Sequence, residues 1–263
     1  MLLLAASVAA AQSWDIQVSG TTASLRGVSA VNARVAWASG AKGTILRTGD
    51  GGATWQNVSP PAAVDMDFRD IEAVSEQVAI AMSAGPGRVS RLYKTVDSGA
   101  NWMLLKSNQE LEGFWDAIAT WDDMHGILMG DPVDGRFTVL TTSDGLNWRE
   151  QIGPKAEKGE AAFAASGTAL VVGGTREAWF ATGGTGGGRV FHSEDAGKTW
   201  MVVRTPLRPS AEGSGIFSIA MAGARGVAVG GDYMKPAESS GNIVVSDNAG
   251  GKWSVPASAP GGY

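Results

Sequence analysis

The stretch Thr48-Gly-Asp50-Gly-Gly52-Ala-Thr54-Trp55 decides the fold, because it recurs along the chain. Two copies are of full length, at residues 95–102 and 193–200. Two more are degenerate, since residues 142–148 are one residue short and residues 246–253 carry Asn248 at the aspartate position. The five tryptophans are spaced by 47, 46, 52 and 53 residues. That spacing is about the length of one four-stranded β-propeller blade.

Each residue type in this repeat has a mechanical role. The aspartate can accept hydrogen bonds from backbone N–H groups of a hairpin turn, and the glycine two residues later supplies a positive φ. The tryptophan then starts an outer strand and packs between neighbouring sheets. We therefore interpret these Asp-box residues as structural rather than catalytic or calcium-binding. They are Asp50, Trp55, Asp97, Trp102, Asp144, Trp148, Asp195, Trp200, Asn248 and Trp253.

The same order of short apolar segments precedes every Asp box. We expect inner strands at residues 25–31, 68–74, 114–120, 161–166 and 216–221. Second strands follow at 35–39, 78–83, 126–129, 178–181 and 226–229, and third strands at 44–47, 91–94, 137–141, 190–192 and 243–245. Short alternating strands at this spacing predict an all-β fold. The prediction is a β-propeller of four-stranded blades with five recognisable repeats.

The N-terminus carries an export pattern. Residues 1–11 are apolar and small, and Ala9 and Ala11 fit the −3 and −1 positions of a signal-peptidase site. The segment lacks a basic start, so it is an incomplete or atypical signal peptide; the alternative, an apolar strand, is disfavoured by its alanine content. It is too short to span a bilayer as a helix, and no transmembrane segment is expected elsewhere. We predict a periplasmic or secreted protein.

The two ends also bear on closure of the ring. Residues 14–18 (WDIQV) resemble the starts of the fourth strands, as expected if the N-terminal strand completes the last blade. The other strands of that blade would then follow residue 263. We therefore predict a propeller domain over residues 12–263 that is incomplete at its C-terminus and belongs to a six- or seven-bladed ring.

The composition argues against several functions. A net charge of −5 without a basic run gives no reason to expect nucleic acid. The chain has no cysteine, and its two histidines, His125 and His192, stand apart, so no metal site is expected. The glycine-rich residues 182–188 link two strands instead of opening a helix, which removes the dinucleotide-binding mechanism. We expect no cofactor.

Between the boxes the chain resembles the photosystem II assembly and stability factor family of Asp-box (BNR-repeat) propellers. The resemblance covers residues 14–263 and is closest to exported bacterial homologues, which are often labelled "oxidoreductase". It rests on residues 68–73 (FRDIEA), 85–87 (GPG), 90–95 (SRLYKT), 114–119 (FWDAIA), 125–135 (HGILMGDPVDG) and 230–233 (GGDY). It implies seven blades and a scaffold role in assembling a membrane complex. The label "oxidoreductase" has no support in the residues, and the photosynthetic partner is not implied.

An enzymatic function has to be considered, because the same Asp boxes occur in sialidases and some glucanases. A sialidase-like site needs three arginines and a nucleophilic tyrosine, but no Arg-Ile-Pro segment appears and the tyrosines are few. Asp70 and Asp116 fall at equivalent positions on successive inner strands, so they are the candidate catalytic pair for glycoside hydrolysis. They could equally cap strand starts or pair with Arg26 and Arg69. Glycoside hydrolysis is the alternative function.

A binding surface is the other hypothesis, because propellers present functional residues at one mouth of the channel. Aligning the inner strands places Arg26, Arg69, Trp115, Glu160 and Ile216 at one position, with Asp70 and Asp116 one residue later. Loops after the second strands add Asp131, Asp134, Asp232 and Tyr233. A mixed acidic, basic and aromatic rim suits a protein or peptide partner, whereas the alternative for each residue is a solvated loop end. We predict an exported binding or assembly scaffold, associated with a membrane complex.

Overall fold

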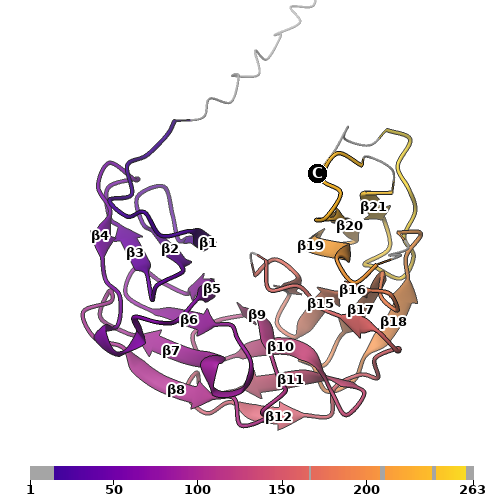
Figure 1. Cartoon of the computed structure of the whole chain (residues 1–263), viewed down its shortest axis with the longest axis horizontal. Helices are drawn as coiled ribbons and strands as arrows, with labels where there is room; N and C mark the ends of the chain where they lie inside the picture. The colour runs from indigo at the N-terminus through magenta and orange to yellow at the C-terminus, as the bar shows by residue number, and fades with distance from the viewer. Residues whose placement is uncertain (1–14, 166, 208–210, 239–240, 259–263) are drawn as a thin grey trace, which may run out of the picture.

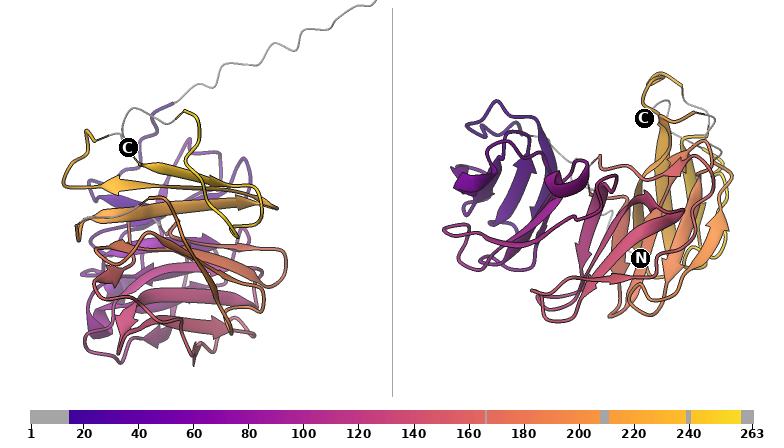
Figure 2. Two further views of the ribbon diagram at one scale, coloured as in Figure 1. Left: turned by 90° about the vertical axis from the view of Figure 1, so that its right-hand side faces the viewer. Right: turned by 60° about the horizontal axis from the view of Figure 1, so that its bottom comes forward.

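The computed structural model describes residues 15–165, 167–207, 211–238 and 241–258. The predicted signal peptide and Trp14 lie outside these residues. Within them, five antiparallel sheets stand side by side in an open arc (Figure 1), and two turned views show how the sheets twist along it (Figure 2). The described residues contain helix only as two short 3-10 turns, η1 (Pro61–Ala63) and η2 (Gly87–Val89). The chain is therefore an all-β propeller, as the repeats predict.

The first three blades follow the predicted order of strands. Blade 1 consists of β1 (Leu25–Ala30), β2 (Ala36–Gly40), β3 (Ile45–Thr48) and β4 (Gln56–Asn57). Blade 2 consists of β5 (Phe68–Ala73), β6 (Ala79–Ser83), β7 (Arg91–Thr95) and β8 (Met103–Ser107). Blade 3 consists of β9 (Trp115–Thr120), β10 (Gly126–Val133), β11 (Arg136–Thr142) and β12 (Arg149–Gln151).

The last two blades depart from simple sequence order, because β13 and β16 come from the stretch of sequence around blade 4 but join the sheet of blade 5. Blade 4 consists of β14 (Leu170–Gly173), β15 (Glu177–Ala181), β17 (Arg189–Ser193) and β18 (Met201–Arg204). Blade 5 consists of β13 (Glu160–Ala161), β16 (Gly183–Gly184), β19 (Ser214–Ala222), β20 (Arg225–Asp232) and β21 (Ile243–Ser246). A single bridge between Val245 and Ser254 stands where the fourth strand is expected. No helix in the described residues is long and apolar enough to cross a membrane.

The predicted inner strand at residues 161–166 is wrong. The inner strand of blade 4 is β14, which pairs with β15 from Leu170↔Phe180 to Gly173↔Glu177. Residues 161–165 are mostly alanine, which has a low strand propensity, whereas β14 contains two valines. In the described part of the predicted segment, residues 161–165, only Ala161 lies in a strand. That strand is β13, which pairs with β16 and so joins the sheet of blade 5.

Four apolar cores lie between successive blades, and each receives the tryptophan of one Asp box. Trp102 meets the edge of Trp37 between blades 1 and 2, and Trp148 is buried between blades 2 and 3. Trp200 packs against the core between blades 3 and 4, and Trp253 is buried between blades 4 and 5. These cores join neighbouring sheets through the burial of aromatic and aliphatic side chains.

The Asp-box turns show how these tryptophans are positioned. In the fourth box the Asp195 carboxylate accepts the N–H of Thr199 (2.8 Å) and its hydroxyl (2.7 Å). The Ser193 hydroxyl donates to Asp195 (2.9 Å) and accepts the N–H of Gly197 (2.8 Å). Asn248 uses its one amide oxygen in the same way, accepting the N–H of Lys252 at 2.8 Å.

Residues 15–18, the described part of the segment predicted to complete the last blade, are not in a strand here. Instead, the Gln17 amide donates to the Gly51 carbonyl (3.2 Å) and accepts from the Trp55 indole (3.1 Å) in the first Asp box. Trp55 lies on a face of blade 1 that no other described blade covers, so its indole N–H takes this polar side chain as its partner.

Candidate functional site

The inner strands of four blades carry a β-bulge near their starts. In β1 and β5 the pairing register skips Arg26 and Arg69. In β9 it skips Asp116, and in β19 it skips Phe217. A bulge leaves one residue unpaired and redirects its side chain, and bulges are common next to functional sites. The four skipped residues therefore occupy equivalent positions near the starts of the inner strands.

The bulges correct the alignment made from the sequence. Trp115 and Ile216 were expected beside Arg26 and Arg69, but they lie one position earlier and are buried in the cores between blades. Asp70 and Asp116 are for the same reason not equivalent, since Asp70 follows its bulge and Asp116 is the bulged residue. A bulge shifts the phase of a strand by one residue, which a pattern of alternating residues does not reveal.

Two of the bulged residues gather on one carboxylate. Arg69 Nε lies 2.8 Å from Asp67, and Arg26 Nε lies 3.7 Å from the other oxygen of the same side chain. The Arg26 side chain keeps 36% of its surface exposed. Asp67 was not among the predicted residues; the only signal for it is its position two residues before Arg69.

Behind this surface pair lies a buried carboxyl. Asp70 is 4% exposed, and its carboxylate accepts the N–H of Ile118 in the next blade at 2.7 Å. Burial raises the pKa of Asp70 to about 7, against the lowering effect of that hydrogen bond. Burial, with the charge of Asp70 second, raises the pKa of the neighbouring Glu72 to about 8. Glu72 was not among the predicted site residues, because the alternation of apolar and polar residues along β5 gives no reason to single it out.

Asp116 and Asp131 form a second acidic pair on blade 3. Asp116 is 1% exposed, and its Oδ2 has no hydrogen-bond partner in the described residues. Burial and then the charge of Asp131 raise the pKa of Asp116 well above its usual range, although Arg69 opposes the shift. Burial also raises the pKa of Asp131, whose carboxylate accepts the N–H of Ala162 at 2.9 Å.

We call Arg26, Asp67, Arg69, Asp70, Asp116 and Asp131 the mouth cluster. Its side chains already bind backbone groups of the segment between β13 and β14. Asp131 accepts the N–H of Ala162, and Arg69 donates to the carbonyl of Ala164 (3.3 Å). Farther along, the Thr168 carbonyl accepts the N–H of Ile219 in β19 (2.8 Å). These bonds tie the segment between β13 and β14 to blades 2 and 3 of the same chain.

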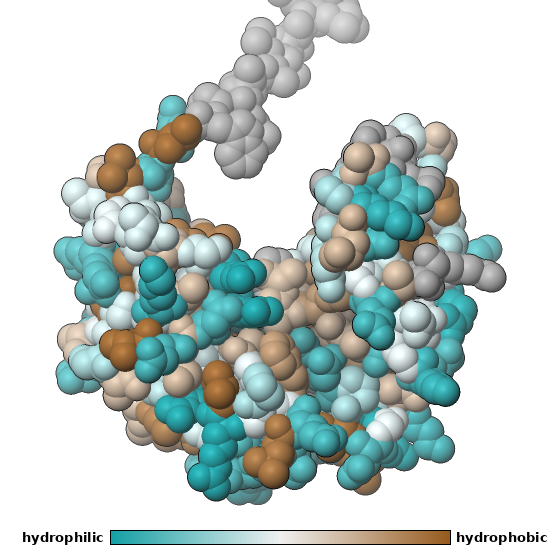
Figure 3. Space-filling model, in the orientation of Figure 1, coloured by the Kyte–Doolittle hydropathy of each residue, from teal (hydrophilic) through white to brown (hydrophobic). Residues whose placement is uncertain are grey.

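Aromatic rings extend the same surface toward blade 5. Phe163 meets the bulged Phe217 edge to face at 4.8 Å and Tyr233 at 6.4 Å. Tyr233 is 56% exposed, with the exposed Met234 beside it. In Figure 3 the concave side of the arc accordingly carries both hydrophilic and hydrophobic residues.

The other predicted rim residues have local structural roles. Glu160 is buried and accepts hydrogen bonds from Nε and Nη2 of Arg189, and it accepts the Thr182 hydroxyl at 2.6 Å. The Asp232 carboxylate accepts the N–H of Met234 (2.9 Å) in the turn after β20. Asp134 has a left-handed φ of 51° in the turn between β10 and β11.

The histidines do not build a metal centre. His125 contacts Asp122 at 2.9 Å, and His192 stacks on Trp179 at 4.5 Å between ring centres. Across the part of the chain that the structure describes, no three His, Asp or Glu side chains are arranged to hold a metal ion.

The buried carboxyls make stability depend on pH. Because folding raises the pKa of Asp70 to about 7 and that of Glu72 to about 8, the folded state binds more protons than the unfolded state above about pH 4. The free energy of unfolding should therefore fall as pH rises from about 4 to 8 and level off above that. The slope is at most about 1.4 kcal/mol per pH unit for each such carboxyl.

Asp70→Asn should flatten this decline, because the amide oxygen can still accept the Ile118 N–H while the charge is absent. Urea unfolding at several pH values measures the effect, and Asp65→Asn, which changes an exposed aspartate, is the control. An unchanged slope in Asp70→Asn would contradict the assignment.

Comparison with known proteins places the chain in a family. A family model described as "Photosynthesis system II assembly factor YCF48" matches residues 6–152. The chloroplast photosystem II stability/assembly factor HCF136 of Arabidopsis thaliana is 30% identical over 114 residues, which are 43% of this chain and 27% of that protein. The matched part thus spans about a quarter of that relative's length.

Two solved structures are similar over most of the chain. A structure titled "YCF48 bound to D1 peptide" has 16% identity and a TM-score of 0.47, and covers 94% of this chain and 87% of that one. The computationally designed Ika8 protein has 13% identity and a TM-score of 0.54, covering 91% of this chain and 62% of that one. Because the family model matches more than half of the chain, this protein belongs to the YCF48 family of photosystem II assembly factors.

Proposed function

We propose that this protein is an assembly factor that binds a segment of a partner protein at the mouth cluster. The observation that carries the proposal is the match to the assembly-factor family over residues 6–152. The partner we propose is a protein of a membrane complex in the cell envelope.

The accessible part of the mouth has the composition of a protein interface. Arg26 is partly exposed, and Tyr233 and Met234 are well exposed at the end of β20. Arginine, tyrosine and methionine are enriched in interfaces, and arginine and tyrosine are frequent hot-spot residues. These residues make first contact, and the buried carboxyls behind them hold the surface in place.

We predict that the double variant Arg26→Ala/Tyr233→Ala loses its partner. Affinity capture from native envelope extracts, read out by quantitative mass spectrometry, should show at least about tenfold less partner than the parent protein. Arg34→Ala is the matched control, because Arg34 is an exposed arginine of the same blade outside the mouth. Equal recovery with both variants would reject the mouth as the binding surface.

Glycoside hydrolysis is the second candidate function, and it rests only on the carboxyl pair Asp70 and Asp116. Both carboxyls are nearly inaccessible, and Asp70 is already bonded to the Ile118 N–H. A general acid has to reach the glycosidic oxygen, so this burial favours binding over hydrolysis. Turnover of a glycan panel that disappears in Asp70→Asn would reverse that preference.

We further propose that the protein is exported, on the strength of the apolar residues 1–11 and the small residues Ala9 and Ala11. The mature protein recovered from the periplasm or medium should begin at Gln12. Intact-mass spectrometry decides the matter, and a secreted product that begins at Met1 would contradict cleavage.

A further inference from the structure

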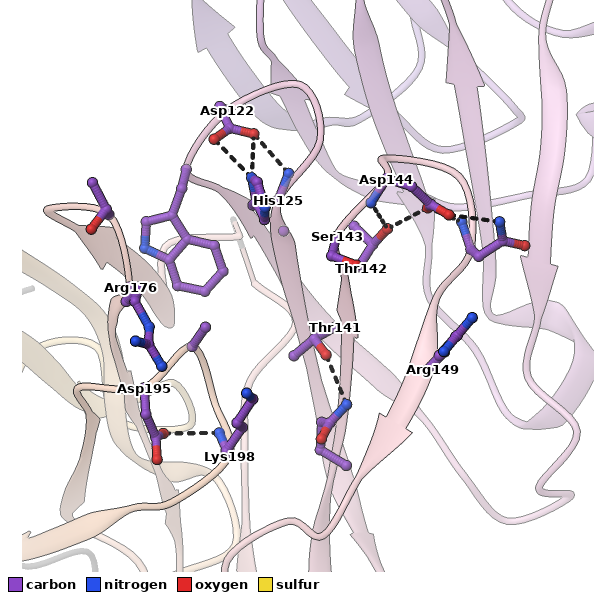
Figure 4. Close-up of a pocket in the computed structure, with 16 residues that line it drawn as sticks. Asp122, His125, Thr141, Thr142, Ser143, Asp144, Arg149, Arg176, Asp195 and Lys198 are labelled. Carbon is purple, nitrogen blue, oxygen red and sulfur yellow. Dashed lines mark hydrogen bonds and ion pairs between the residues drawn. The ribbon is translucent and has the colours of Figure 1, made fainter.

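The junction of blades 3 and 4 carries two depressions that differ in charge. In the larger one, shown in Figure 4, the carboxylates of Asp122, Asp144 and Asp195 lie among the cationic side chains. The smaller one lies between β18 and the residues after β12, has a volume of about 320 Å³, and has no carboxylate among its described lining residues. We call it the basic groove after its lining residues Arg136, Lys155 and Lys198.

These three cations of the basic groove are available to a ligand. Lys155 and Lys198 are exposed, and in the described part of the chain their side chains form no hydrogen bond or ion pair. Arg136 is also exposed, and it uses only Nη1, which donates to a backbone carbonyl at 2.8 Å. The basic groove therefore combines free positive charge with the absence of acidic lining.

The acidic side chains around the basic groove are already paired. Glu160 is buried and accepts hydrogen bonds from Arg189, which also lines the groove. Glu157 pairs with Arg204 and lies 3.6 Å from Nη1 of the same Arg189. Asp195 lines the other depression, where its carboxylate accepts the N–H groups of its own Asp box. These carboxylates stabilise their own surroundings and leave the three free cations without partners.

A structurally equivalent groove between blades 1 and 2 allows a direct comparison. It is lined by Trp102 and Leu104, where the basic groove has Trp200 and Val202. In both grooves the apolar floor thus consists of the Asp-box tryptophan and the second residue after it. This apolar floor follows from the propeller repeat itself.

The two lysines, by contrast, do not follow from the repeat. Lys198 stands two residues before its box tryptophan (198 to 200), where the equivalent groove has Ala100 (100 to 102). Lys155 stands seven residues after the box tryptophan of blade 3 (148 to 155), where the equivalent groove has Ala62 (55 to 62). The fold accepts alanine at both positions, so packing does not account for the lysines. Attraction of an anion does.

The walls of the basic groove suit an amphiphile better than a peptide backbone. On the blade 3 wall the Pro154 carbonyl already accepts the N–H of Phe137 at 3.0 Å, and proline has no N–H to donate. Ile152 and Val202 instead leave apolar surface beside the cations, since they are 78% and 48% exposed. This combination fits a ligand in which an anionic headgroup is joined to an apolar chain.

We propose that the basic groove binds an anionic phospholipid at a membrane surface. Its three cations pair with the phosphate, because lysine and arginine both bind phosphate and are attracted to anionic lipid. Ile152 and Val202 contact the apolar part of the lipid next to the headgroup. The net charge of −5 does not prevent this, because charges farther away than about 8 Å are screened at physiological salt. The basic groove shares no residue with the mouth cluster.

The test measures co-sedimentation of the full chain with vesicles of phosphatidylcholine that contain about 30% phosphatidylglycerol, and with vesicles of phosphatidylcholine alone. The test variant is Lys155→Ala/Lys198→Ala, which introduces the residue type of the equivalent groove at both positions. The control is Lys158→Ala/Lys252→Ala, which removes the same charge from exposed lysines outside the groove. A third variant, Ile152→Ser/Val202→Ser, keeps every charge. Thermal unfolding checks that each variant is folded.

We expect the parent protein to bind the vesicles with phosphatidylglycerol but not those without it. The test variant should bind at least about tenfold more weakly, and the control within about twofold of the parent. Equal weakening in these two variants, or no binding by the parent, would overturn the proposal. Unchanged binding of the serine variant, or full release by millimolar inorganic phosphate but not by chloride of the same ionic strength, would show a site for a free anion and overturn the lipid assignment.

Discussion

The hydrogen bonds of the Asp box are the interaction on which the rest of the structure depends. They hold two successive residues in the left-handed region, such as Ala196 and Gly197 with φ of 60° and 84°. For a residue with a Cβ atom this conformation costs about 1 kcal/mol or more, so the side-chain bonds have to offset it. The turn then places Trp200 against Phe180 in the core between blades 3 and 4, which joins the sheets.

The fold was predictable from the sequence because the box is local chemistry. Acceptor, glycine and tryptophan stand at fixed offsets, and Asn248 shows that one side-chain oxygen suffices to hold the turn. The inner strand of blade 4 was not predictable in this way. The alanine run at residues 161–165 has no strand preference of its own, and its position depends on contacts with Asp131 and Arg69 from other blades.

The candidate site was predictable only in part, and the bulges are the physical reason. Arg26 and Arg69 were placed correctly with respect to each other, but Trp115 and Ile216 were assigned to a position that Asp116 and Phe217 occupy. A one-residue shift moves a side chain from the core to the mouth, and alternation along a strand does not encode where that shift occurs. Burial of Asp70 and Asp116 likewise follows from packing between blades.

The most direct measurement of the central claim compares Asp195→Asn with Asp195→Ala in thermal unfolding. The account predicts that the asparagine variant keeps most of the Tm, because its amide oxygen can accept the Thr199 N–H as Asn248 accepts that of Lys252. The alanine variant should lose clearly more, since it leaves the left-handed residues of the turn without their acceptor. Equal losses in the two variants, or no loss in either, would contradict the claim that these hydrogen bonds hold the blades together.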